Sequence, residues 1–270
     1  MKTYTTVLTI AGSDGSGGAG IQADIKTFGA MGCYGLSVIT ALTAQNTMGV
    51  HAIYPVDESC VAAQFRAIAS DIPIDAVKIG MLGSAGMITT ISRLLSELRG
   101  NPPVILDTIL ASSRGTPLLP RDAIQFMKEK LFPLASLITP NLPETTILLG
   151  LKDAPATRES IEEAAMKLLE TGTASVLIKG GHGEGSMCCD CLLHENRFFW
   201  FSSKKITTDN THGTGCTLSS AIAAFMAKGE TTENAVEKAK TYLNEALHAG
   251  ATYRLGNGNG PLFQHCRQWR

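Results

Sequence analysis

Residues 5–28 read TTVLTIAGSDGSGGAGIQADIKTF, and this stretch decides the fold class. Its first part, Thr5–Ala11, is short, apolar and β-branched, which predicts a buried strand. The segment that follows contains too many glycines for regular structure, and then Ile21, Ile25 and Phe28 recur at the spacing of a helix. The stretch therefore predicts a strand, a glycine loop and a helix in immediate succession, which is typical of an α/β fold.

The same alternation continues along the chain. Strands are predicted at 36–41, 50–54, 76–79, 104–107, 136–139 and 175–179, and helices at 58–70, 84–98, 121–130, 157–171, 215–228 and 231–249. This order predicts a mostly parallel sheet with helices on both faces. Segments 190–194 and 197–201 flank Glu195 and Asn196 as in a hairpin, so we expect an antiparallel edge. Without an internal repeat, linker or low-complexity tract, residues 1–270 are predicted to form a single domain.

Composition excludes several classes of protein. The chain has 270 residues, 44% of them hydrophobic, and its 23 basic and 24 acidic residues give a formal net charge of -1. This balance argues against a nucleic-acid or anionic-membrane surface, and the apolar content argues against disorder. No apolar run reaches the ~20 residues of a membrane span, and the N-terminus lacks the pattern of a signal peptide. Seven cysteines, an odd number in a large chain, predict reduced thiols and a cytoplasmic location.

The glycine loop fits the pattern G-x-G-x-x-G at 15–20, but a dinucleotide site is not expected. Such a site needs an acidic residue about 20 residues further on, and none lies between Ile25 and Val56. We interpret the loop as bare backbone against which a small ligand lies. A P-loop motif is absent from the sequence. Asp24 borders the apolar stripe of the following helix, so it is either a ligand contact or an acid that interacts with the helix dipole.

Polar residues near the ends of three other strands are further candidates. The Gln45 amide combines donor and acceptor and suits the edge of an aminopyrimidine, although it could be an ordinary loop residue. Asn141 and Glu144 could hold a hydrated Mg²⁺, or they could simply begin a helix. Lys179, which precedes two glycines, could bind a nucleotide phosphate or could be a solvated surface lysine.

The strongest motif is NTHGTGCT at 210–217, which opens a helix. Backbone N–H groups at a helix start bind anions, and Gly213 and Gly215 let the backbone curl without Cβ clashes. Such an arrangement of N–H groups matches the charge that develops on a transferred phosphoryl group. Cys216 is expected in the first helical turn, where the dipole favours a thiolate of lowered pKa; the alternative is an inert, packed cysteine.

A cysteine-rich segment suggests a metal site less strongly. Cys188, Cys189 and Cys191 lie close to His182 and His194 in the sequence. Zinc sites usually pair C-x-x-C with a second ligand pair, and Cys188 and Cys191 would face opposite sides of a strand. We therefore interpret these residues as incidental thiols.

Taken together, the motifs resemble those of bacterial hydroxymethylpyrimidine/phosphomethylpyrimidine kinases. The resemblance lies in blocks that follow the same order along nearly the whole chain: AGSD at 11–14, GGAGIQAD at 17–24, AQNT at 44–47, KIGM at 78–81, TPNLPE at 139–144, KGGH at 179–182, HGTGCT at 212–217 and GNGNGP at 256–261. It implies a ribokinase-like three-layer α/β/α fold and a homodimer. It also implies two successive ATP- and Mg²⁺-dependent phosphorylations in thiamine biosynthesis, first of 4-amino-5-hydroxymethyl-2-methylpyrimidine and then of its monophosphate.

The resemblance also implies roles for individual residues, by matching positions. The pyrimidine pocket would be lined by Gly12, Asp24, Gln45 and Met81. Mg²⁺, through water, and the ATP phosphates would be bound by Asn141, Glu144 and Lys179. The catalytic anion hole would be formed by Gly213, Thr214, Gly215 and Cys216. Related sugar kinases have an Asp as base at the position of Cys216, so a strong general base is not expected here.

Two other functions compete with this interpretation. Pyridoxal kinases of the same branch resemble the chain, but they typically carry an apolar residue at the position of Gln45, which would leave the polar edge of an aminopyrimidine unpaired. A non-catalytic ligand sensor on the same scaffold is expected to lack the anion loop or the Mg²⁺ positions, and all of these residues are present. We therefore expect a pyrimidine kinase.

Overall fold

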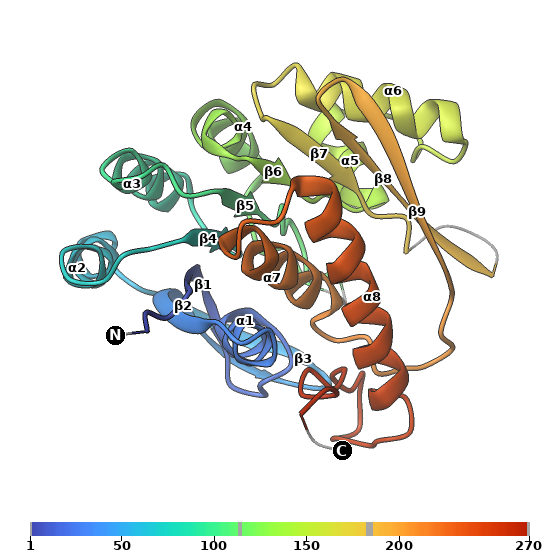
Figure 1. The fold of residues 1–270 in the computed structure, drawn as a ribbon, viewed down its shortest axis with the longest axis horizontal. Coiled ribbons are helices and arrows are strands. Elements are labelled where there is room, and N and C mark those ends of the chain that lie inside the picture. The colour runs from blue at the N-terminus through green and yellow to red at the C-terminus, as the bar shows by residue number, and fades with distance from the viewer. Residues whose placement is uncertain (1, 113–114, 182–185, 269–270) are drawn as a thin grey trace.

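A nine-stranded sheet organises the chain, in the order β3-β2-β1-β4-β5-β6-β7-β8-β9 (Figure 1). The computed structural model describes residues 2–112, 115–181 and 186–268. The strands are β1 (Thr6–Asp14), β2 (Tyr34–Asn46), β3 (Gly49–Pro55), β4 (Ala76–Ile79), β5 (Val104–Leu106), β6 (Leu137–Ile138), β7 (Ser175–Ile178), β8 (Met187–His194) and β9 (Arg197–Lys204). From β2 to β7 the neighbours in this order are parallel, whereas β3, β8 and β9 pair antiparallel with their neighbours.

Helices cover both faces of the sheet, which gives three layers (Figure 1). One face is covered by α1 (Gly20–Ala30), α7 (Thr214–Ala227) and α8 (Thr232–Gly250). The other is covered by α2 (Glu58–Ala69), α3 (Ala85–Ser96), α4 (Arg121–Lys130), the short 3-10 turn η1 (Phe132–Leu134), α5 (Leu142–Leu149) and α6 (Arg158–Leu169). Along β1, Val7 faces the first layer while Leu8 and Ile10 face the second. Because the central parallel strands are buried on both faces, their sequences are nearly continuous apolar runs. The predicted α/β/α sandwich is confirmed.

No helix in the described part of the chain is long and apolar enough to cross a bilayer.

The antiparallel hairpin expected near residues 190–201 is confirmed as β8 and β9. A second antiparallel pair, β2 with β3, closes the opposite edge and was not expected. The structure also corrects the start of the glycine loop, because Gly12 to Asp14 continue β1 instead of leaving it. Ser13 and Asp14 pair with Leu42 and Thr43 of β2 after a register shift, so the long β2 keeps β1 extended.

The site lies where the sheet order changes direction. The chain passes from β1 to β2 on one side, and β4 adds to β1 on the other. Loops that follow such neighbouring parallel strands separate and leave a crevice at the carboxyl ends of the strands. The glycine turn after β1 and the Gly80-Met81 segment after β4 both lie there.

Candidate active site

The glycine turn and the segment that opens α7 touch through their backbones. Gly213 has a φ of 86°, and a Cβ atom there would lie 1.8 Å from the carbonyl oxygen of Gly18. A Cβ atom at Gly18 would in turn lie 2.3 Å from Cδ2 of His212. Only glycine allows this approach and this positive φ. The two glycine motifs of the sequence therefore form one site.

Asp14 holds the glycine turn in shape. Its Oδ1 accepts hydrogen bonds from the amide and hydroxyl of Ser16 at 2.9 and 2.7 Å, and its Oδ2 accepts from the Ala19 amide at 2.8 Å. His212 Nε2 lies 2.8 Å from the same Oδ2. Burial raises the pKa of Asp14, but the hydrogen bonds from His212, Ser16 and Ala19 outweigh it and lower the pKa to about 2. The sequence analysis assigned Asp14 no role, although an Asp two residues before Ser in a turn is a local signal.

Lys179, after β7, lies against residues Gly213–Cys216, the predicted anion-binding loop, called the anion loop below. A Cβ atom at Gly215 would be 3.5 Å from Lys179 Nζ. The N–H groups of this first turn of α7 have no partner within the helix, and they lie at the positive end of its dipole. The Lys179 side chain is only 14% exposed, so the alternative of a solvated lysine is wrong. Burial lowers the pKa of Lys179, but the negative charges of Asp107 and Glu144 raise it by more. The net pKa is therefore raised, and the ammonium keeps its charge.

Asp107, which directly follows β5, is the counter-ion of Lys179, at 3.0 Å. It also accepts hydrogen bonds from Thr139 at 3.1 Å and Ser219 at 3.2 Å. Burial raises the pKa of Asp107, and the Lys179 and Lys78 charges more than reverse this, so the pKa is lowered. The sequence placed Asp107 at a strand end but gave it no role, because a carboxylate alone does not reveal its partner.

Asn141 and Glu144 do begin a helix. Asn141 Oδ1 accepts from the Glu144 amide at 2.8 Å, and Glu144 Oε2 accepts from the Asn141 amide at 2.8 Å, which is a capping box at the start of α5. Glu144 Oε2 also accepts from Thr108 at 3.3 Å. Burial raises the pKa of Glu144 to about 7 against the opposing charge of Lys179, with Asp107 adding to the rise. A buried carboxyl group of this kind fits Mg²⁺, which prefers oxygen ligands and would supply the missing positive charge.

We expect Glu144→Gln to raise stability in a pH-dependent way. The folded pKa of about 7 exceeds the usual 4.5, so the folded protein binds this proton more tightly than the unfolded chain. The contribution of Glu144 to wild-type stability should therefore be most favourable below pH 4.5 and should fall between pH 4.5 and 7. Gln keeps the capping box but does not ionise. In thermal unfolding without Mg²⁺, the variant should exceed the wild type more at pH 8 than at pH 5; parallel curves would contradict the raised pKa.

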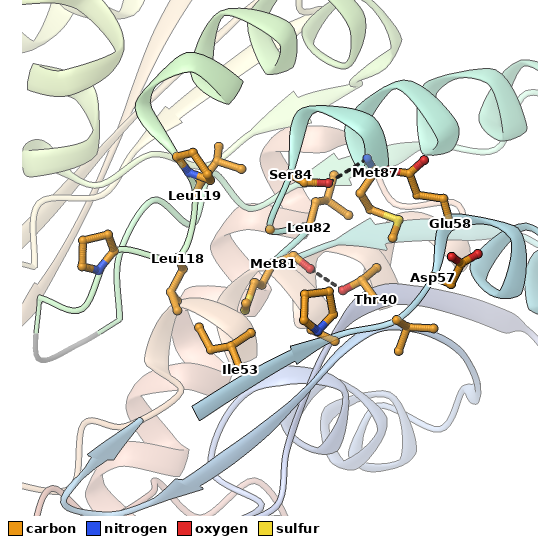
Figure 2. A pocket seen from close by; sticks show the side chains of 16 residues that line it. Thr40, Ile53, Asp57, Glu58, Met81, Leu82, Ser84, Met87, Leu118 and Leu119 are labelled. Carbon is orange, nitrogen blue, oxygen red and sulfur yellow. Dashed lines mark hydrogen bonds between the residues drawn. The ribbon is translucent and has the colours of Figure 1, made fainter. Parts of the chain in front are cut away.

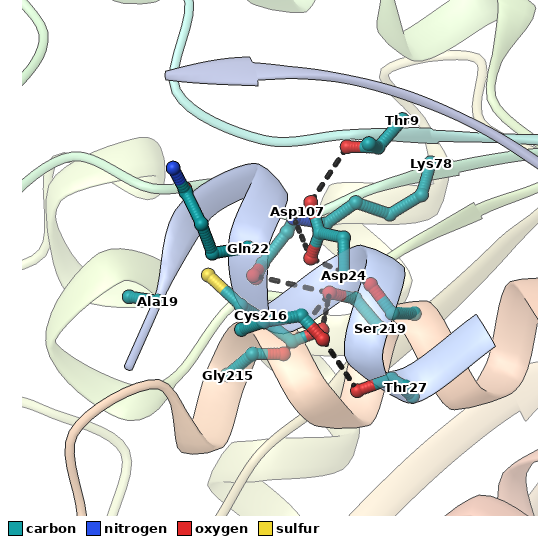
Figure 3. A network of polar contacts seen from close by, with 12 residues as sticks. Thr9, Ala19, Gln22, Asp24, Thr27, Lys78, Asp107, Gly215, Cys216 and Ser219 are labelled. Atoms are coloured by element: carbon teal, nitrogen blue, oxygen red, sulfur yellow. Dashed lines mark hydrogen bonds and ion pairs between the residues drawn. The ribbon is translucent and has the colours of Figure 1, made fainter. Parts of the chain in front are cut away.

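Cys216 is buried at the start of α7 (Figure 3). Burial raises the pKa of its thiol to about 11, against the charge of Lys78 and with support from Asp24 and Asp107. The expectation of a thiolate with a lowered pKa is therefore wrong: removal of the thiol from water outweighs the helix dipole. A neutral thiol is a weak hydrogen-bond donor, not a base.

Asp24 is fully buried in an ion pair beneath the anion loop (Figure 3). Its Oδ1 accepts from Lys78 at 2.9 Å and Ser220 at 2.7 Å, and its Oδ2 accepts from Lys78 at 2.9 Å and Thr9 at 2.6 Å. Both oxygens are thus occupied by protein donors, so neither the expected ligand contact nor the helix-dipole role describes Asp24. Burial lowers the pKa of Lys78, but Asp24 more than compensates and the pKa is raised.

The residues expected around a ring are not gathered at one cavity. Gly12 and Met81 are in contact, since a Cβ atom at Gly12 would lie 3.3 Å from Met81 Sδ. Met81 borders a cavity of about 730 Å³, lined largely by apolar residues such as Ile53 and Leu119 (Figure 2). Gln45 borders a separate cavity of about 20 Å³ together with His212, Ser112 and Asn259. The sequence gave no sign of this division.

The C-terminal glycine run supports the segment before the anion loop. The His212 amide donates to the Gly260 carbonyl at 3.0 Å, and a Cβ atom at Gly260 would lie 2.0 Å from Asn210 Oδ1. Asn210 Nδ2 donates to the carbonyls of Gly250 and Tyr253, each at 2.7 Å. This run is therefore structural support for the anion loop.

The cysteine-rich segment does not gather ligands. Among the described residues there is no group of three His, Cys, Asp or Glu side chains that could hold a metal ion. Cys191 is buried in β8, whereas Cys188 lies beside Lys240 and Asp190. His182 lies outside the described residues.

Comparison with known proteins assigns the family. A family model described as phosphomethylpyrimidine kinase matches residues 14–263. The chain belongs to the phosphomethylpyrimidine kinase family. One relative of this kinase is the hydroxymethylpyrimidine/phosphomethylpyrimidine kinase of Escherichia coli, 44% identical over 262 residues, which are 97% of each chain. Another is the thiamine biosynthesis bifunctional protein ThiED of Geobacter sulfurreducens, 46% identical over 257 residues; they are 95% of this chain and 51% of that protein, so this kinase spans about half of it.

The phosphomethylpyrimidine kinase fold is shared with solved pyridoxal kinases. The pyridoxal kinase from Staphylococcus aureus in complex with ADP superimposes with a TM-score of 0.91 at 28% identity, over 99% of this chain and 96% of that one. The ribokinase-like fold implied by the sequence motifs is thus confirmed.

Proposed function

We propose that this protein is a kinase that transfers a phosphoryl group from ATP to 4-amino-5-hydroxymethyl-2-methylpyrimidine, and then a second one to the monophosphate, in thiamine biosynthesis. The observation that carries the proposal is the contact between the Gly213–Cys216 loop and the ammonium of Lys179. The printed name of the Escherichia coli relative supports the choice of substrate.

Charge stabilisation is the main task that we assign to the anion loop. The transferred phosphoryl group spreads negative charge over its oxygens in a loose transition state, so oriented donors and cations matter more than a strong base. The amides of Gly213, Gly215 and Cys216 and the ammonium of Lys179 would provide them, whereas the Thr214 amide donates to the Thr211 carbonyl at 3.2 Å. Mg²⁺, bound by Asn141 and Glu144 through water, would neutralise phosphate charge when present. The neutral thiol of Cys216 would donate a hydrogen bond without taking the proton of the substrate.

Ring recognition is assigned to Gln45, whereas Gly12 and Met81 lie together and Met81 borders the other cavity. One amide can donate to a ring nitrogen and accept from the neighbouring amino group of an aminopyrimidine. The cavity beside Gln45, of about 20 Å³, has room for a single water molecule. Ring binding therefore requires its walls at Ser112 and Asn259 to move apart. Asp24 takes no part in this assignment, because its oxygens are occupied by protein donors.

Pyridoxal kinase is the second candidate, favoured by the structural likeness to the Staphylococcus aureus enzyme. Phosphate transfer from ATP to the hydroxymethylpyrimidine, its monophosphate and pyridoxal, each assayed at equal concentration, separates the two. We expect a higher kcat/KM for both pyrimidines than for pyridoxal. Turnover of pyridoxal alone would support the second candidate, and turnover of none would support a ligand sensor.

Gln45→Met should weaken the use of the pyrimidine more than that of pyridoxal. Loss of the amide leaves the polar edge of the aminopyrimidine unpaired, at ~1–3 kcal/mol, which corresponds to a roughly 5- to 150-fold loss of kcat/KM. The measurement is kcat/KM for both substrates on the variant and on the wild type. An equal loss for both would show that Gln45 does not read the pyrimidine.

Cys216→Ala should lower kcat about 10²-fold, the effect of one lost donor at a developing charge, while KM for the pyrimidine stays unchanged. Cys216→Ser, which keeps a donor, should retain more activity. Because burial raises the pKa of the thiol to about 11, the wild-type rate should show no step from thiolate formation between pH 6 and 9. Unchanged kcat in Cys216→Ala would exclude the thiol from the reaction.

We further propose that residues 1–270 act as one kinase domain, as a homodimer in the cytoplasm. Free cysteines, which include Cys33, Cys60 and Cys266, support a reducing compartment. The mass of the protein in solution tests the dimer.

A further inference from the structure

Asp14, His212 and Gln45 come from three separate segments and meet at one ring nitrogen. His212 Nε2 lies 2.8 Å from Asp14 Oδ2 and 3.2 Å from the end of the Gln45 side chain. Asp14 is the last residue of β1, directly before the glycine turn, and His212 directly precedes Gly213, which touches that turn at Gly18. Gln45 is the residue assigned above to the ring.

The contact with Asp14 decides where the imidazole carries a proton. Asp14 has a carboxylate at neutral pH, and a carboxylate only accepts hydrogen bonds. At 2.8 Å, His212 Nε2 must therefore carry a hydrogen and donate it. A protonated Nε2 has no lone pair, so it cannot accept a hydrogen bond from Gln45.

This proton also decides the orientation of the Gln45 amide. With its nitrogen toward His212, the amide would place two donors 3.2 Å apart. Rotation of the amide by half a turn puts Oε1 toward His212, and Nε2 then lies 3.2 Å from Thr43 Oγ1. The Thr43 hydroxyl donates its single hydrogen to the Ser13 carbonyl at 2.9 Å, so its oxygen is free to accept from Gln45. Only the rotated amide satisfies every donor and acceptor in this chain of contacts.

We propose that Asp14 and His212 are positioning residues that hold the Gln45 amide with Oε1 toward His212 and Nε2 toward Thr43, and so set the polarity with which Gln45 meets the ring. This inference rests on the proposed function, because it deepens the role of Gln45. The held amide keeps one N–H and one oxygen lone pair for a ligand. These match a ring nitrogen beside an amino group in one direction only, since the reversed amide opposes donor to donor.

Enzyme kinetics on a double-mutant cycle tests whether His212 acts through Gln45. In His212→Ala, the amide is released and KM for the pyrimidine should rise about 10-fold, with kcat within about twofold of the wild type. Gln45→Met combined with His212→Ala should be no worse than Gln45→Met alone. Additive losses, or a fall in kcat in place of the rise in KM, would mean that His212 only supports the anion loop and would overturn the proposal. His248→Ala, which removes an exposed imidazole of α8, is the control for loss of a histidine.

Thr43→Val tests the proposed contact between Gln45 Nε2 and the Thr43 hydroxyl, and it leaves Asp14 and His212 unchanged. Valine keeps the shape of threonine but removes the acceptor for Gln45 Nε2, so KM for the pyrimidine should rise about 3- to 10-fold and kcat should persist. Thr43→Ser keeps the acceptor and should behave like the wild type. Equal KM values for the Val and Ser variants would overturn the proposed orientation.

The tautomer of His212 can be observed directly by long-range ¹H–¹⁵N correlation in the labelled wild-type protein. The proposal requires a hydrogen on Nε2 at neutral pH, and a ring protonated on Nδ1 alone overturns it. This readout does not depend on activity. If the wild type fails to phosphorylate the pyrimidine, the proposed function is wrong, while the tautomer still decides whether Asp14 and His212 orient the amide.

Discussion

Lys179→Met should lower kcat about 10³-fold, because it removes a cation that lies against the loop proposed to bind the transferred phosphoryl group. Cations that face the transferred group in phosphoryl transfer account for losses of this size. Lys179 reaches this place because β7 ends beside the first turn of α7, where a Cβ atom at Gly215 would lie 3.5 Å from its Nζ. Steady-state kinetics with saturating ATP measures the loss, and turnover within tenfold of the wild type would show that the ammonium does not face the phosphates.

The control for this variant must separate chemistry from folding. Lys179→Met leaves Asp107 as an unpaired buried carboxylate, which by itself is destabilising. Lys179→Met combined with Asp107→Asn removes both charges and keeps acceptor and donor atoms at Asn. The double variant should recover stability in urea unfolding but not kcat. Recovery of kcat together with stability would mean that Lys179 matters only for folding.

Lys78→Met should lower the free energy of unfolding by ~3–5 kcal/mol, the usual effect of removing one partner of a buried ion pair. Both side chains of the pair, Lys78 and Asp24, have no exposed surface. Without the ammonium, Asp24 keeps Thr9 and Ser220 as its donors among the described residues, and its charge is left buried. Urea unfolding followed by circular dichroism at pH 7 gives the difference.

Lys78→Met combined with Asp24→Asn is the matched control, because it removes the second charge and keeps a side chain that can bond to Thr9 and Ser220. We expect the double variant to be more stable than Lys78→Met alone. If the single variant loses less than about 1 kcal/mol, water reaches the pair and the energetics are those of a surface salt bridge.

The elements that were best predicted are those with a complete local signal. The strand at 76–79 and the helix at 121–130 have the predicted bounds, because a β-branched apolar run and an amphipathic period mark them fully. The end of β2 was missed, since beyond the core it pairs with β3 and is held by that pairing, with Leu42 on the surface instead of in the core. The helix at 142–149 was left as an alternative because its eight residues are too few for a period to stand out.

The candidate site shows the same limit at the level of side chains. The glycine motifs at 15–20 and 213–215 predicted backbone loops, and the structure brings these loops together. Asp24 and Cys216 were misjudged, because their behaviour depends on Lys78 and on burial, which arise only when distant segments pack. Local sequence gives the chemistry of a group but not its partner.

The direct backbone contact between Gly18 and Gly213 has a consequence for how binding of the pyrimidine and binding of ATP affect each other. Because the backbones at Gly18 and Gly213 leave no room for even a Cβ atom between them, a shift of the glycine turn should displace the segment that opens α7. If the proposed ring and nucleotide sites lie on these two segments, we expect binding at one to change the affinity at the other, and such linkage is reciprocal: whatever one ligand does to the affinity for the other, the second does equally to the first.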